Sequence, residues 1–181
     1  MAKRIKDQPQ NKKYPSAEFL YSVALEDYNR TLGNYDKIYD RANIALALCS
    51  ALLVAILNNV DIKSLLSYCS YAAMKKVIVA CYGLSSLGSA ILLVVATIRL
   101  LLVTRSRKML SFDSNSIKAE KLYIETVEDA ALWVSLQYIR STNDVGTQVK
   151  DKQGKLNRAL LEIVVSLLLF AVSVIIHNGG L

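Results

Sequence analysis

The side chains that most often carry out catalysis or bind metals are few and scattered in this sequence. His177 is the single histidine and begins the last five residues. Cys49, Cys69 and Cys81 lack the short spacing of a metal site, and an odd number of cysteines cannot all pair within one chain. No base is placed in a pattern that would activate a nucleophile. We therefore expect no enzymatic activity, no metal and no cofactor.

The acidic residues suggest two different environments. Glu125, Glu128 and Asp129 cluster in a segment with a soluble character, where a solvated helix face is the usual explanation. Glu162 stands near the start of an apolar run. An acid close to a membrane boundary either reaches back to water or lines a polar path. A position about one turn inside the run favours the first interpretation, and we mark Glu162 as a candidate polar residue at the membrane boundary.

Three apolar runs must position everything else. Of the 181 residues 53% are hydrophobic, and residues 42–60 and 77–98 form runs of 19 and 22 without a charge. At about 1.5 Å per residue, each is long enough for the roughly 30 Å hydrocarbon core of a bilayer. We predict transmembrane helices at 42–60, 77–98 and 159–176. Buried helices of a soluble bundle are the alternative, but residues 46–57 and 91–98 carry no polar stripe.

The basic residues predict the orientation. Lysine and arginine number 8 in residues 1–41, 3 in 61–76 and 11 in 99–158, with none after 176. The positive-inside rule then places the basic tail 1–15, a helix at 16–41 and the segment 99–158 in the cytoplasm. The loop 61–76 and the tail 177–181 lie outside. We expect a multi-pass protein of the bacterial inner membrane, and the net charge of +7 needs no nucleic-acid partner to explain it.

The cytoplasmic helix at 16–41 carries a stripe dominated by tyrosine. Its members recur at intervals of four and three residues, which is the spacing of one helical face: Tyr21, Leu25, Tyr28, Leu32, Tyr35 and Tyr39. We expect this helix to continue into the first membrane span, with Gly33 as a possible point of bending. A tyrosine face suits a protein contact because each ring buries apolar area while its hydroxyl finds a partner or water.

A second cytoplasmic stripe lies in residues 117–138. It consists of Ile117, Ile124, Val127, Ala131, Val134 and Tyr138. Two stripes on one side of the membrane are natural partners, either within one chain, closing a small bundle, or between subunits. The polar residues 141–157 that follow suit a loop or a continuing helix. The predicted fold is thus all-α, with three transmembrane helices and two cytoplasmic amphipathic helices.

Small residues concentrate in the first two spans. The candidate packing positions are Ala47, Ala51 and Ala55 in the first, and Ser85, Gly88 and Ser89 in the second. Small side chains let membrane helices approach closely, since packing drives their association in lipid. The pattern suits a tight hairpin of the two spans, or self-assembly of several copies.

The arrangement resembles a group of small bacterial antiphage membrane effectors. The segments that carry the resemblance are YDKIYDRANIALALCSALL, which leads into the first span, and KLNRALLEIVVSLLLF, which leads into the third. The chain is similar over residues 20–176 to the SLATT families and to the transmembrane effectors of Pycsar systems. The third span departs from the two-span SLATT pattern, and Asp40 to Asn43 match the Pycsar-type motif only in part.

The resemblance implies an oligomeric effector that disrupts or permeabilises the inner membrane in abortive antiviral defence. Its trigger would be a cytoplasmic protein or a nucleotide signal encoded nearby, and its other partners would be the bilayer and further copies of the same chain. The alternative is a structural or regulatory membrane subunit that anchors a cytoplasmic partner. A small transporter or channel is a third class, which the scarcity of charges within the spans disfavours.

Overall fold

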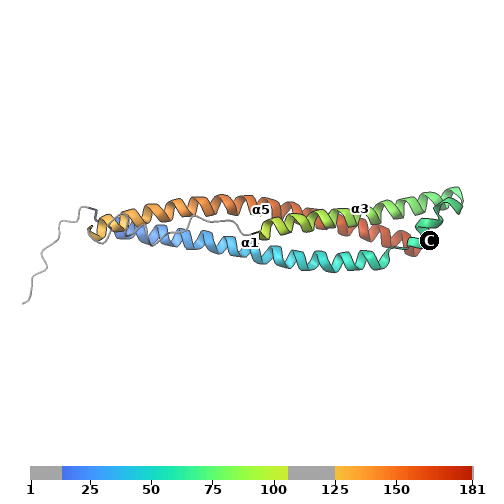
Figure 1. The fold of residues 1–181 in the computed structure, drawn as a ribbon, viewed down its shortest axis with the longest axis horizontal. Coiled ribbons are helices and arrows are strands. Elements are labelled where there is room, and N and C mark those ends of the chain that lie inside the picture. Colours follow the sequence, from blue (N-terminus) through green and yellow to red (C-terminus); the bar gives the residue numbers. More distant parts are fainter. Residues whose placement is uncertain (1–13, 106–124, 181) are drawn as a thin grey trace, which may run out of the picture. The chain divides into compact units, whose positions relative to one another are not determined.

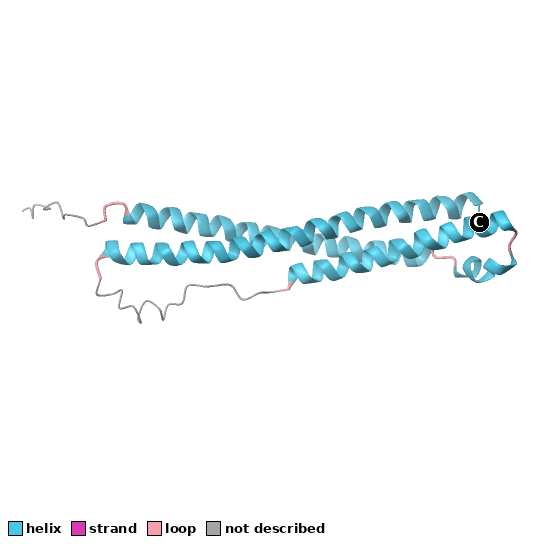
Figure 2. Cartoon of the chain, turned by 90° about the horizontal axis from the view of Figure 1, so that it is seen from above, coloured by secondary structure: helices cyan, strands magenta, loops and turns pink. Residues whose placement is uncertain are grey.

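The computed structural model describes residues 14–105 and 125–180, and all of its regular elements in these ranges are helices. Three are long: α1 (Ala17–Asn59), α3 (Ala73–Thr104) and α5 (Val127–Gly180). The short helix α2 (Ile62–Leu66) and the 3₁₀ turn η1 (Ser67–Ser70) connect α1 to α3. Figures 1 and 2 show the course of the chain.

Each long helix contains a stretch apolar enough to cross a membrane. This stretch is most hydrophobic in α5 and least hydrophobic in α1. The predicted spans 77–98 and 159–176 fall inside α3 and α5, and the predicted span 42–60 falls inside α1 except for Val60, which follows the end of that helix. The regular structure of the described residues is therefore all helical, and three helices long and apolar enough to cross a membrane indicate a multi-pass membrane protein.

The two predicted cytoplasmic helices do not appear as separate elements. Residues 17–41 are the first part of α1, and no proline interrupts the chain where the uncharged run begins. Gly33 lies inside the same helix with open space around its Cα, and one glycine costs about 1 kcal/mol, too little to break a helix of 43 residues.

Residues 141–157 continue the helix α5 and do not form a loop. Their buried positions follow the helical repeat, but they are mostly polar: Ser141, Val145, Gln148, Lys152 and Leu156. Because the buried stripe is polar, the sequence shows no apolar face here, although one side of the helix is covered.

The chain divides into two compact units. The first contains α1 up to Tyr35 and α5 from Val127 to Val149; the second contains α1 from Asp36, the elements α2, η1 and α3, and α5 from Lys150. In the first unit the two helices run in the same direction, since Tyr14 bonds to Glu128 and Tyr28 packs on Tyr138.

In the second unit α3 runs antiparallel to α1 and α5. Its buried residues alternate at intervals of three and four, as in a helix held between partners: Val79, Tyr82, Ser86, Ser89, Leu93, Ala96, Leu100 and Val103. The helix α3 contacts α1 and α5 at both of its ends, and it contacts α5 in its middle. These contacts form the candidate site.

Candidate functional site

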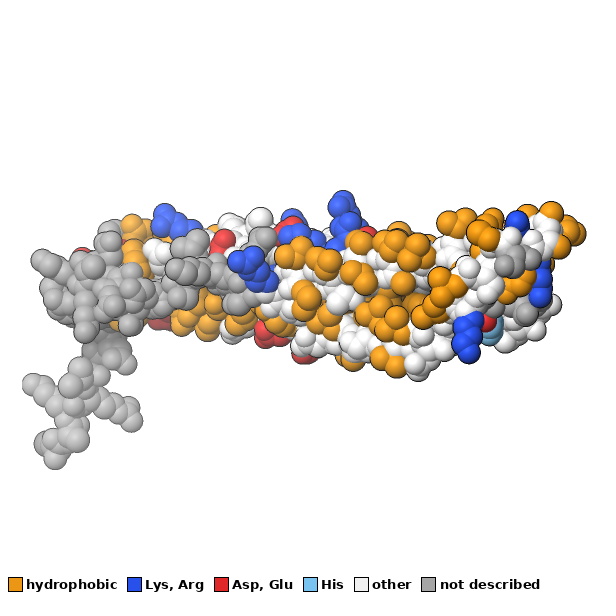
Figure 3. Space-filling model, turned by 45° about the vertical axis from the view of Figure 1, so that its right-hand side comes forward, with side chains coloured by type: hydrophobic (Ala, Val, Ile, Leu, Met, Phe, Trp, Pro, Cys, Tyr) orange, Lys and Arg blue, Asp and Glu red, His pale blue; other side chains and the backbone are white. Residues whose placement is uncertain are grey.

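The second unit is apolar outside and partly polar inside. Large apolar side chains exposed on its surface include Ile44, Val54, Leu57, Leu84, Leu87, Ile91, Ile98, Leu161, Val164, Leu168 and Ile175. Figure 3 shows such side chains gathered over the spans. Buried between the helices are serines: Ser86, Ser89, Ser166 and Ser173. Water-soluble bundles have the opposite distribution, so this surface is built for lipid.

A pair of serines holds α3 and α5 together near the middle of the spans. The Ser89 hydroxyl lies 2.9 Å from the Ser166 carbonyl, and the Ser166 hydroxyl lies 2.8 Å from the Ser89 carbonyl. Both side chains are fully buried. A side chain can reach the backbone of the facing helix in both directions only when the two helices approach closely, which small residues allow.

The predicted small-residue positions are divided between packed and exposed surfaces. Ser89 is buried and Gly88 faces α5, where an added Cβ would lie 3.6 Å from Leu169. Ala47 and Ala51 are exposed, while Ala55 and Ser85 are half-buried. The packed face of α1 consists instead of Ala42, Ala45, Cys49 and Ile56. Within one chain, the predicted alanine stripe therefore contributes little to packing.

Glu162 forms an ion pair with Arg99 across α3 and α5. The Arg99 Nε lies 2.8 Å from the Glu162 Oε1, and the glutamate side chain is 16% exposed. Its second oxygen, Oε2, is buried and makes no hydrogen bond with the described residues. Glu162 therefore has a protein partner at the membrane boundary. Sequence reasoning missed Arg99, although antiparallel helices place the end of one span beside the start of the next.

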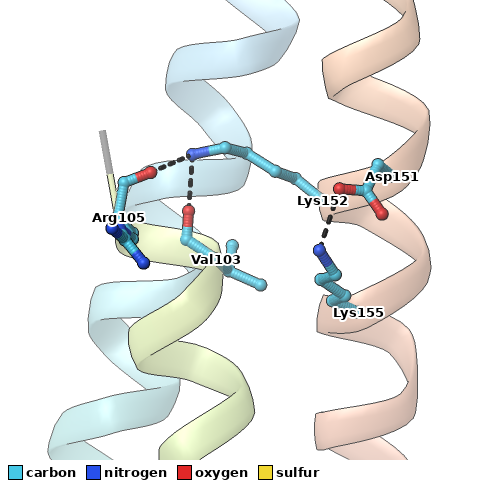
Figure 4. A network of polar contacts seen from close by, with 5 residues as sticks. All are labelled: Val103, Arg105, Asp151, Lys152 and Lys155. Carbon is cyan, nitrogen blue, oxygen red and sulfur yellow. Dashed lines mark hydrogen bonds and ion pairs between the residues drawn. The ribbon is translucent and has the colours of Figure 1, made fainter. Parts of the chain in front are cut away.

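Lys152 caps the end of α3. Its ammonium group is 2.6 Å from the Val103 carbonyl and 3.0 Å from the Arg105 carbonyl, although the residue is only 2% exposed (Figure 4). The same Nζ lies 4.6 Å from the centre of the Tyr39 ring, whose hydroxyl donates to the Thr104 carbonyl. The last carbonyls of a helix have no hydrogen-bond donor within the helix. At the end of α3, the Lys152 ammonium group of α5 and the Tyr39 hydroxyl of α1 supply these donors.

At the other end of the spans, Tyr82 connects α3 to the end of α1 and to α5. The residue is fully buried, and its hydroxyl donates to the Asn59 carbonyl at 2.6 Å and accepts from the Asp61 amide at 2.9 Å. Its ring stacks on His177, with 5.6 Å between ring centres. The single histidine therefore takes part in packing.

In the first unit the tyrosine stripe of α1 meets α5. Tyr138 packs against Tyr21 and Tyr28, with ring centres 6.0 and 5.4 Å apart. Burial, followed by the neighbouring Tyr21 and Tyr28 hydroxyls, raises the pKa of Tyr138 above its usual value. The three rings thus form a contact within one chain, which we call the tyrosine cluster.

The other predicted stripe residues have several environments. Leu25 and Leu32 are half-buried, Tyr35 is buried in the first unit, and Tyr39 belongs to the second. On α5, Ala131 and Val134 line a shallow hollow beside the cluster, and Val127 is mostly exposed. Ile117 and Ile124 lie outside the described residues.

The described chain holds no group of three or more histidine, cysteine or acidic side chains that could bind a metal ion. Cys49 is buried in α1, and Cys69 and Cys81 are exposed. Comparisons with protein families, with curated proteins and with solved structures found no match to this chain. The functional argument therefore depends on the geometry described above.

Proposed function

We propose that this protein is a non-enzymatic membrane effector of bacteria that assembles in the inner membrane and permeabilises it when triggered. The observation that carries the proposal is the distribution of polarity in the spans. Buried serines and one ion pair lie between helices whose outer surfaces are apolar. If several copies assemble and these helices rotate or separate, the same polar faces can line a path for water and ions.

The exposed alanines of α1 support the assembly step. Ala47 and Ala51 lie on a surface that packing within the chain leaves free. Small residues on a lipid-facing helix allow a second helix to approach closely. A cytoplasmic protein or nucleotide signal encoded nearby would act as the trigger, and abortive antiviral defence is the biological setting that the sequence resemblance implies.

The test is raised expression of the full chain in bacteria, followed with a potential-sensitive dye and by growth. We expect depolarisation and arrest with the wild type. Ala51→Phe should reduce both, because the bulky ring prevents close approach while the exposed position leaves the fold intact. Leu57→Phe is the matched control, since Leu57 is also exposed on α1 but lies on a different side of the helix from Ala47 and Ala51.

An unchanged membrane potential, with abundant protein in the membrane fraction, would contradict the proposal. That result would favour a structural or regulatory membrane subunit that anchors a cytoplasmic partner. The half-exposed apolar residues on the first unit give this second candidate its support, because such a surface is suited to a protein contact.

A further inference from the structure

An apolar groove runs along the first unit between α1 and α5. Its volume is about 450 Å³, and its apolar walls are Leu20, Val23, Ala24, Leu132, Leu136 and Ile139. Four of these residues, Leu20, Val23, Leu136 and Ile139, remain 46–54% exposed. Glu26, Asp27 and Arg30 form its charged rim. Two helices cannot by themselves cover both sides of their seam, and this side stays open among the described residues.

On the opposite side of the same helix pair, the tyrosine cluster lies beside the hollow lined by Ala131 and Val134. Tyr21 and Tyr28 pack on Tyr138 there, so the tyrosine cluster is satisfied within the chain. Of the two hollows, the groove has the more extensive apolar lining, which favours it as the surface for association. Its rim carries both signs of charge, whereas a nucleotide or a phosphate group would need a cationic lining. A groove with aliphatic walls and a rim of both charge signs fits a protein surface that is itself aliphatic and carries both charge signs.

We infer that a second copy of this chain covers the groove, so that two α1–α5 pairs join into a four-helix assembly. The inference rests on the proposed function, which requires association of copies, and it names the surface that brings them together. Leu20 and Val23 of each copy would enter the groove of the other. Such an isologous contact buries the same apolar residues twice.

The proposed contact has a two-fold axis that runs along the helix pair of the first unit. Corresponding helices of the two copies then run in the same direction, and α1 of one copy lies beside α5 of the other without a change of height. Tyr138 packs on both Tyr28 and Tyr21 of α1, which precede it by 110 and 117 residues. A residue of α5 therefore lies at about the same height as the α1 residue that precedes it by a number in this range.

This register makes the two surfaces complementary in charge. Arg140 follows Glu26 by 114 residues, which lies between 110 and 117, so the two side chains lie at about the same height. Both side chains are exposed. Glu26 lines the groove, and Arg140 follows Leu136 by one turn on the same side of α5. In a two-fold pair, Glu26 of each copy therefore lies level with Arg140 of the other. Opposite charges at the rim favour this register over others.

The experiment crosslinks two differently tagged full-length chains in native membranes. The three native cysteines are replaced by alanine; one chain then carries Val23→Cys and the other Leu136→Cys, so that only a contact between copies can join the tags. A bismaleimide should produce a band of dimer size carrying both tags. Ser22→Cys in place of Val23→Cys is the control, since Ser22 is exposed but does not line the groove, and the band should then be lost.

The charge register is tested in the same system. Glu26→Arg should weaken the dimer band, and adding Arg140→Glu should restore it. Equal bands from the Ser22 and Val23 pairs, no dimer band at equal membrane levels, or a crosslink only to a protein of another mass would each overturn the inference. Membrane potential measured on the same cells separates the two proposals: a dimer band without depolarisation contradicts the proposed function alone, and depolarisation without the band contradicts the groove contact alone.

Discussion

Replacing Lys152 with methionine tests whether α5 caps the end of α3. Methionine keeps an unbranched apolar side chain of similar length but removes the ammonium group that binds the Val103 and Arg105 carbonyls. Leaving a buried polar group without its partner costs about 1–3 kcal/mol, and two carbonyls are affected. The loss of the ammonium above the Tyr39 ring adds about 0.5–2 kcal/mol.

Part of this loss is offset, because a buried ammonium group is itself costly to take out of water. We expect a net destabilisation of about 2–4 kcal/mol. The assay is unfolding of the purified protein in mixed micelles by sodium dodecyl sulfate, followed by circular dichroism.

Lys155→Met is the matched control. Lys155 lies on the same helix and pairs with Asp151 at 2.9 Å, but its side chain is 32% exposed (Figure 4). An exposed pair of this kind contributes about 0.3–0.5 kcal/mol. If the two substitutions shift the transition equally, Lys152 does not cap α3 and the reasoning is refuted.

Four further predictions concern other contacts. Arg99→Glu should destabilise the spans by about 1–3 kcal/mol in the same assay by placing like charges together at a partly exposed site, and Glu162→Arg in the same chain should recover most of the loss. Tyr28→Asp with Tyr35→Asp should disrupt the first unit in limited proteolysis but leave membrane insertion intact, whereas Asn29→Lys should be tolerated because Asn29 is exposed. Because the pKa of Tyr138 is raised, its contribution to stability should be complete below pH about 10 and lost as pH rises through the raised value; absorbance titration should show one tyrosine fewer ionising above pH about 10 in Tyr138→Phe. A membrane-impermeant maleimide should label Cys69 in intact cells and spare Thr147→Cys, and the reverse pattern would invert the predicted topology.

The spans could be predicted from sequence because an uncharged apolar run long enough to cross a bilayer indicates a transmembrane helix. The packed face of the first span could not. Ala42, Ala45 and Cys49 form the buried face, yet Ala47 and Ala51 are equally small and recur at helical spacing. A helix rich in alanine offers small residues on more than one side, and only the partner helix decides between them.

The polar contacts between the helices also could not be predicted from the sequence. The buried stripe of α5 includes Gln148 and Lys152, so residues 141–157 lack the apolar repeat that identifies a covered helix face. Likewise, Glu162 was identified as an acid at a boundary, but its partner Arg99 is 63 residues away in the sequence and belongs to another helix. Contacts of this kind depend on how antiparallel helices are paired, which local spacing does not contain.

The capping of α3 also bears on how the protein is made. During synthesis α1 and α3 leave the ribosome before α5, and at that stage the Val103 and Arg105 carbonyls and the Arg99 guanidinium have none of the α5 partners that they contact in the finished structure. The nascent hairpin of two helices is therefore an incomplete product, with a cation and helix-end carbonyls near the lipid boundary. Insertion of the last helix brings a hydrogen-bond donor to the carbonyls and a carboxylate to the arginine. A chain whose translation stops before Lys152 should therefore be recognised and degraded by membrane quality control.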